Sequence, residues 1–145
     1  MKHLEKAMEC YGYSRLYHRD WLESIFKSGG HNFPISSNWC SIFIDFIAKE
    51  SGLQRPEKAA AARNWLKVGL AVQKPKIGDV VVFWRESPDS WKGHVGIFIS
   101  RDSDNKMYLL GGNQGPNRSV VAQKYPFDRV LGYRRLIADE RWNNG

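Results

Sequence analysis

The feature that most constrains the fold is a change of hydrophobic period near the middle of the chain. Before about residue 67 the apolar residues recur at helical spacing, whereas beyond Pro75 they gather in short runs rich in Val, Ile, Phe and Tyr. The connections between these runs are too short for crossover helices, so the strands must pair antiparallel. The pattern predicts an α+β fold, with N-terminal helices packed on a C-terminal antiparallel sheet of about five strands. The expected helices are 2–12, 18–27, 39–51 and 58–67, and the expected strands are 79–85, 94–101, 106–111, 119–124 and 130–137.

Length and composition are those of one globular domain. The chain has 145 residues, 42% of them apolar, and we expect residues 1–145 to form a single domain. No apolar run approaches the length of a membrane span. The net charge of +7 favours a polyanionic partner, and nucleic acid, anionic lipid and bacterial cell wall all fit that description.

Cys40 is the first candidate for chemistry. It follows Ser36, Ser37 and Asn38, which are N-cap residue types, so we expect it in the first turn of a capped helix. Unpaired N–H groups and the helix dipole favour a thiolate there. The alternative is a small buried hydrophobic residue. Cys10 lies in a polar segment, and two cysteines are too few for a disulfide scaffold.

His94 is the best candidate for a base beside Cys40. It begins a predicted strand in which it shares a face with Gly96 and Phe98. Gly96 would leave that face open, so that the helix carrying Cys40 could approach the imidazole. The alternative is an ordinary histidine at a strand end. The remaining histidines are weaker candidates because they lie in polar helices or a Gly-rich loop: His3, His18 and His31.

A Cys–His pair usually needs a third group to orient the imidazole. Asn113 follows a glycine pair at the end of a predicted strand, and its side-chain carbonyl could accept the second imidazole N–H. Asparagine as a simple turn residue is the alternative. The sequence has no CxxC or HxxxH spacing and no phosphate-binding glycine motif, so we expect no metal site and no cofactor.

Six segments in this order resemble papain-like bacterial cell-wall hydrolases of the NlpC and CHAP type. The resemblance covers roughly residues 34–136 and leaves residues 1–33 as an unassigned helical extension. The segments are Asn38-Trp39-Cys40-Ser41-Ile42-Phe43, Ala61-Ala62-Arg63-Asn64-Trp65-Leu66, Ile77-Gly78-Asp79-Val80-Val81-Val82-Phe83, Trp91-Lys92-Gly93-His94-Val95-Gly96, Leu110-Gly111-Gly112-Asn113-Gln114 and Leu131-Gly132-Tyr133-Arg134.

The resemblance implies a cysteine peptidase or amidase that hydrolyses amide bonds of peptidoglycan. The family's nucleophile falls on Cys40, its base on His94 and its third polar residue on Asn113, with the adjacent Gln114 as the alternative. Some members have His or Glu in the third position, so Asn113 departs from their pattern.

Four residues are expected to contact substrate: Asn38, Trp84, Trp91 and Gln114. The two tryptophans flank the loop before His94 and could line a cleft, although aromatic residues in such a sheet are core residues at least as often. The backbone N–H of Cys40 is the expected oxyanion donor, helped by Asn38 or Ser37.

Two other classes of function compete with this interpretation. A basic chain with six Trp and six Tyr could be a nucleic-acid-binding module. Its Lys and Arg residues are scattered, however, and Arg134-Arg135 is the only adjacent basic pair, so we expect no nucleic-acid partner. The other competitor is a catalytically inactive wall-binding domain on the same fold.

The first twenty residues carry charge throughout and lack an apolar core, so we expect synthesis in the cytoplasm without a signal peptide. A wall hydrolase made in this way would act on the wall or periplasm after release or injection. A phage lysin would depend on a holin. An injected antibacterial amidase toxin would depend on secretion machinery and would have a cognate immunity protein.

Overall fold

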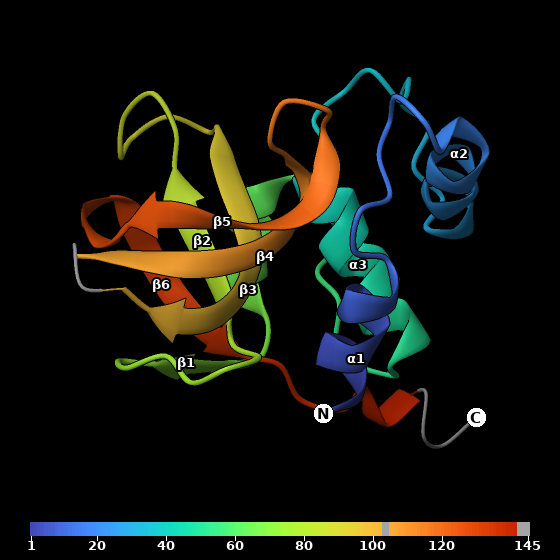
Figure 1. Ribbon diagram of the computed structural model, residues 1–145. Helices are drawn as coiled ribbons and strands as arrows, with labels where there is room; N and C mark the ends of the chain where they lie inside the picture. The colour runs from blue at the N-terminus through green and yellow to red at the C-terminus, as the bar shows by residue number, and fades with distance from the viewer. Residues whose placement is uncertain (103–104, 142–145) are drawn as a thin grey trace.

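The computed structural model describes residues 1–102 and 105–141, and it has the predicted α+β architecture. The helices lie together on one side of a strongly curved sheet (Figure 1). The sheet has six strands where about five were expected. The elements are α1 (Lys2–Glu9), α2 (Arg19–Ser28), α3 (Cys40–Glu50), the 3-10 helix η1 (Ala62–Lys67), β1 (Leu70–Val72), β2 (Val80–Trp84), β3 (Gly93–Arg101), β4 (Lys106–Gln114), β5 (Ser119–Pro126), the 3-10 helix η2 (Phe127–Arg129) and β6 (Val130–Arg135).

All paired strands are antiparallel, in the order β1-β6-β2-β3-β4-β5. The five predicted strands are present, and β1 is the addition. β1 escapes a pattern-based prediction because it has only three residues, of which Leu70 and Ala71 are exposed. The helix expected over residues 58–67 is shorter than predicted, since only Ala62–Lys67 is helical and it is a 3-10 helix.

The sheet separates two hydrophobic cores. The larger core lies between the sheet and the helices, where Phe43 of α3 and Val95 of β3 are fully buried. A smaller core fills the other face and includes Phe83 and Leu109. Because both faces of the central strands are covered, β2 is an unbroken run of apolar residues and not an alternating one.

Helix α3 is held at its first turn and near its middle. The buried Ser41 hydroxyl donates to the backbone carbonyl of Ala59 and accepts a hydrogen bond from Trp65 Nε1 at 2.8 Å. Farther along, the buried Asp45 carboxylate binds His31 at 2.8 Å and both Nε and Nη2 of Arg55, at 2.7 and 3.0 Å. The helix is therefore tied to the segments that precede and follow it.

The predicted capping of this helix by Ser36, Ser37 or Asn38 is wrong. Trp39 is the N-cap residue, and it makes no side-chain capping hydrogen bond. Its fully buried indole packs edge-on against Phe43, with ring centroids 6.3 Å apart. Apolar packing, in place of a polar cap, thus fixes the start of the helix. No helix within residues 1–102 and 105–141 is long and apolar enough to cross a membrane.

Candidate active site

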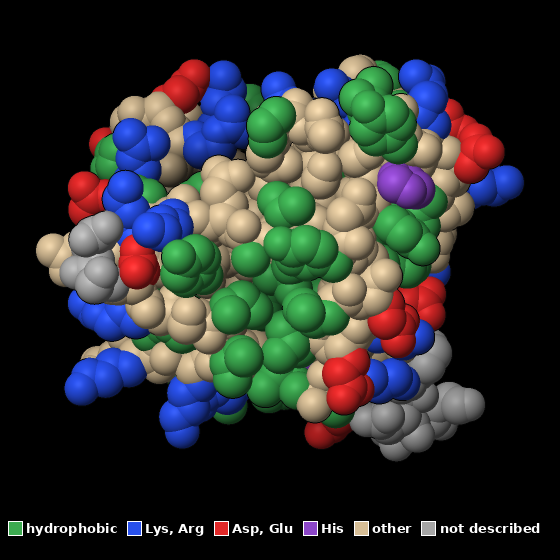
Figure 2. Space-filling view, viewed as in Figure 1, with side chains coloured by type: hydrophobic (Ala, Val, Ile, Leu, Met, Phe, Trp, Pro, Cys, Tyr) green, Lys and Arg blue, Asp and Glu red, His purple; other side chains and the backbone are tan. Residues whose placement is uncertain are grey.

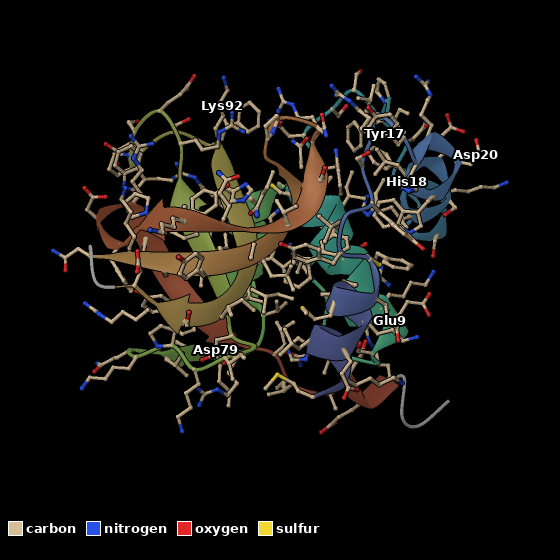
Figure 3. All side chains as sticks on the ribbon, in the orientation of Figure 1. Glu9, Tyr17, His18, Asp20, Asp79 and Lys92 are labelled. Carbon is tan, nitrogen blue, oxygen red and sulfur yellow. The ribbon has the colours of Figure 1, made fainter. Side chains whose placement is uncertain are left out.

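The start of α3 and one end of the central strands form the candidate site. Cys40 is the first residue of α3, and His94 is the second residue of β3, paired across the sheet with Phe83 of β2. Figure 3 places Lys92, which precedes β3, at the upper end of the sheet and Asp79, which precedes β2, at the opposite end. The site belongs to the end marked by Lys92.

A glycine in β4 brings the helix close to the sheet. A Cβ atom on Gly112 would lie 2.5 Å from Cζ3 of Trp39 and 2.9 Å from Cβ of Phe43. The sequence-based assignment of this role to Gly96 is wrong, because the space beside Gly96 holds the side chain of Leu109, 2.6 Å from a hypothetical Cβ. Gly112 is therefore the residue that permits the helix to approach.

Cys40 and His94 form a buried pair whose electrostatic interaction shifts the pKa of each. Burial alone raises the pKa of the Cys40 thiol, but the charge and hydrogen bond of His94 and backbone N–H donors at Val95 and Ser41 outweigh it, so the net pKa is lowered. Burial lowers the pKa of His94, whereas Cys40 and Gln114 raise it, and the net pKa is raised. The two shifts together favour a thiolate–imidazolium pair.

Gln114, the last residue of β4, orients the imidazole. Its Oε1 lies 2.9 Å from His94 Nε2, and its Nε2 donates to the backbone carbonyls of Leu109 and Val121 at 3.2 and 2.7 Å. Since the two carbonyls occupy the amide donors, Oε1 must face the ring and accept a hydrogen bond from it. His94 Nε2 is thus protonated, and Nδ1 remains for the proton exchanged with Cys40.

The structure exchanges the expected positions of Asn113 and Gln114. The hydrogen bond of Asn113 goes to another residue: its Nδ2 donates to Oδ1 of Asn38 at 3.1 Å, and the residue lines the cavity beside Cys40. Gln114, expected also among the substrate contacts, is 2% exposed and lies behind the imidazole. The assignment of the orienting group to Asn113 is therefore corrected to the alternative, Gln114.

Two aromatic rings enclose the imidazole. Tyr125 of β5 stacks on His94 with ring centroids 4.8 Å apart and an interplanar angle of 14°, and Phe83 lies at 6.4 Å. Burial and the neighbouring charge of Cys40 raise the pKa of the Tyr125 hydroxyl. Tyr125 could not be predicted from the sequence, because it lies two strands away from His94 in the sheet and no local motif marks it.

Cys40 opens onto two adjoining hollows. One, of about 260 Å³, is shared with His94, Trp84 and three arginines. The other, of about 120 Å³, is lined by Ala60, Ala61 and Trp91 among others. Asn38 lines both hollows, so three of the expected substrate contacts, Asn38, Trp84 and Trp91, border the space around the cysteine. Ser37 lies farther out, in an apolar hollow next to Trp91.

The other cysteine and the other histidines lie elsewhere. Cys10 is buried beside α1, and burial, with Glu9 nearby, raises its pKa to about 11. His3 binds the carbonyl of Gly78, His31 binds Asp45, and His18 follows Tyr17 before α2, as Figure 3 shows. Among the described residues, no cluster of three or more His, Cys, Asp or Glu side chains could hold a metal ion.

Two solved structures are similar to this chain. A structure described as similar to lipoprotein, NLP/P60 family, from Staphylococcus aureus subsp. aureus Mu50 matches with a TM-score of 0.53 and 17% identity, over 95% of this chain and 41% of that one. An NlpC/P60 family protein from Bacillus cereus ATCC 10987 has a TM-score of 0.47 and 21% identity, over 79% of this chain and 39% of that one. The chain thus spans about two fifths of these proteins, and the first match shows a papain-like fold of the NlpC/P60 type.

The family follows from the sequence match. The model of the CHAP domain matches residues 30–113, more than half of the chain, and this stretch includes Cys40 and His94. The chain therefore belongs to the CHAP domain family, one of the two families that its motifs resemble. No curated protein matches the chain.

Proposed function

We propose that the protein is a cysteine-dependent hydrolase that cuts an amide bond of peptidoglycan. The observation that carries the proposal is the arrangement of Cys40 beside His94, with His94 hydrogen-bonded to Gln114, in the lining of a cavity. Membership of the CHAP family supports peptidoglycan as the substrate. A purely structural cysteine would need neither a lowered pKa nor a histidine fixed in one tautomer.

The reaction follows from the positions of these groups. The Cys40 thiolate attacks the carbonyl carbon of the amide, and a sulfur–carbon bond forms while charge moves to the carbonyl oxygen. As the first residue of α3, Cys40 has its backbone N–H outside the helical ladder, so this N–H can donate to the oxyanion. The His94 imidazolium protonates the leaving amine as the carbon–nitrogen bond breaks.

Hydrolysis of the acyl-enzyme completes the cycle. His94, now neutral, takes a proton from water at Nδ1, and the water oxygen attacks the thioester carbon. The sulfur–carbon bond breaks, the new carboxyl group is released, and the thiolate–imidazolium pair is restored. Gln114 keeps the ring in its orientation throughout by accepting the Nε2 hydrogen bond.

Digestion of purified peptidoglycan, with mass analysis of the released fragments, tests the proposal and identifies the bond. We expect Cys40→Ala to lower the rate by several orders of magnitude, because it removes the nucleophile. Cys10→Ala is the matched control and should keep most of the activity. Binding without cleavage by the parent protein would point to a wall-binding domain, and cleavage by Cys40→Ala at the parental rate would exclude this mechanism.

Where the protein acts is a separate part of the proposal. We propose release by a membrane-permeabilising partner, as for a phage lysin, or injection by secretion machinery, as for an antibacterial amidase toxin with an immunity protein. The single free thiol at the site suits a protein made under reducing conditions.

A further inference from the structure

Three arginines from separate segments meet in the cavity beside Cys40. Arg85 follows β2, Arg118 lies in the turn between β4 and β5, and Arg129 is the last residue of η2. Arg118 has a φ of 52°, a left-handed backbone conformation that is uncommon for a residue with a side chain. Because the three arginines lie in separate segments of the sequence, only folding brings them together.

None of the three guanidinium groups forms an ion pair with a residue that the structure describes. Glu86, next to Arg85 in sequence, pairs with Lys92 at 2.9 Å. Arg129 lies over the ring of Trp84, 4.9 Å from its centroid, which holds the guanidinium at the wall of the cavity. By contrast, three other arginines in the described chain do pair with a carboxylate: Arg55 with Asp45, Arg135 with Asp79 and Arg141 with Asp139.

The other side of the cleft is chemically different. The small hollow on that side of Cys40 is lined by Ala60, Ala61 and Trp91, and it also includes Arg85 and Lys92. The hollow farther out is mainly apolar, with Ile42 and two exposed aromatic residues, Phe33 and Trp91. Figure 2 shows that basic side chains are scattered over the visible face among acidic ones, with no continuous stripe. On this face, therefore, the basic side chains form no continuous surface, whereas three arginines line the one cavity beside Cys40.

We propose that the hollow lined by Arg85, Arg118 and Arg129 is a binding subsite for a free carboxylate of the wall peptide, next to the bond that is cut. This inference rests on the proposed function for its substrate. A guanidinium presents parallel N–H donors that match the two oxygens of a carboxylate, and the bonds are charge-assisted. With a volume of about 260 Å³, the cavity suits one short side chain, whereas a phosphate polymer would need a groove that follows its backbone.

The subsite makes the enzyme sensitive to amidation of its substrate. Conversion of the carboxylate into a carboxamide removes the negative charge and replaces one acceptor oxygen with a donor, which would face guanidinium donors. Substrates with free carboxylates should therefore bind more tightly than amidated ones.

Binding to the Cys40→Ala protein tests this without any need for turnover. The probes are a synthetic stem peptide with free carboxylates and the same peptide with these groups as carboxamides, titrated calorimetrically at low and high salt. We expect at least a roughly tenfold preference for the carboxylate peptide at low salt, reduced at high salt. Replacement of Arg118 and Arg129 together by Gln should remove most of this preference.

The control and the contrary outcomes are specific. Arg19→Gln removes the same charge on α2, away from the cavity, and should keep the full preference. Arg85 is left unchanged because it influences the pKa of His94. Equal affinity for the two peptides, an undiminished preference in the double variant, or tighter binding of a single-stranded oligonucleotide would each overturn the proposal.

The outcome also separates this inference from the proposed function. If the parent protein hydrolyses peptidoglycan but both peptides bind equally, only the carboxylate subsite is wrong. If the arginine-dependent preference is found but the parent cuts no wall bond, the subsite stands and the proposed reaction is wrong.

Discussion

Gln114 and Asn113 are neighbours in β4 with opposite surroundings. Gln114 is buried, accepts one hydrogen bond from His94 and is held in place by two that it donates to backbone carbonyls. Asn113 has a φ of 60° and lines the cavity. A group that fixes the tautomer of a base contributes more to the rate than one that lines the substrate cavity. The two residues therefore allow a direct comparison within one strand.

We expect Gln114→Ala to lower kcat/KM on wall fragments by about 100-fold, and Asn113→Ala to lower it less. Because the Gln114 hydrogen bond raises the pKa of His94, its loss should also move the alkaline limb of the pH–rate profile to lower pH. Asn113→Ala should leave that limb in place. Thermal unfolding of both variants controls for misfolding, and an unchanged profile in Gln114→Ala would remove the positioning role.

The two cysteines should react at very different pH values. The pKa of Cys40 is lowered by its pairing with His94, whereas burial raises that of Cys10 to about 11. Thiolates, not thiols, react with iodoacetamide. At pH 6.5 we expect peptide mapping to find alkylation at Cys40 alone, and the rate should fall as the pH drops through the lowered pKa of Cys40.

The His94→Ala variant is the control for this selectivity. Without the imidazolium, burial should dominate and the reaction of Cys40 should require more alkaline solution. Equal modification of both cysteines at pH 6.5 in the parent protein would contradict the thiolate–imidazolium pair.

At the scale of elements, α3 carries the nucleophile and is held by a buried charged cluster at its middle. Asp45 receives hydrogen bonds from Arg55, which follows the helix in sequence, and from His31, which precedes it. Gly29 completes the arrangement, because a Cβ there would lie 2.5 Å from the His31 ring. The position of Cys40 thus depends on the contacts of Asp45, which lies more than one turn farther along the helix.

We expect Asp45→Ala to lower the free energy of unfolding by about 2–3 kcal/mol, since it leaves His31 buried without its partner while Arg55 can still reach water. Glu50→Ala, an exposed change in the same helix, should alter it by no more than about 0.5 kcal/mol. Urea unfolding measures both. Equal midpoints for the two variants would show that the cluster does not stabilise the helix.

At the scale of the whole molecule, most of the fold could be predicted from the sequence, because hydrophobic period and turn residues are local signals. Cys40 and His94 could be found for the same reason, through the helix start and the strand start that carry them. The third residue could not. The register of β4 shifts between Gly111 and Gln114, and such an irregularity changes which side chains share a face, so that counting alternate residues fails. The arginine-lined cavity was missed because its residues meet only through the fold.

The place of action can be tested on the intact protein. We expect a Gram-negative host to tolerate the protein in its cytosol and to lyse when a fused signal peptide exports it, because the peptidoglycan lies outside the inner membrane. Growth curves of the two strains measure this, and Cys40→Ala should abolish the lysis. Equal killing with and without the signal would indicate an intracellular target. Survival despite verified export would contradict hydrolysis of this host's wall and leave a narrower bond specificity or a non-enzymatic function.

The site is shared between the two halves of the chain, with Cys40 in the helical half and His94 and Gln114 in the strand-rich half. The segment that joins β1 to β2 is largely exposed around Pro75, and the pairing of β1 with β6 holds the halves together. A backbone opened at this point would give two fragments, neither of which has a complete set of catalytic groups. Fused to two other proteins, such fragments would regain activity only when those proteins meet, and the chain would then serve as a reporter of their association.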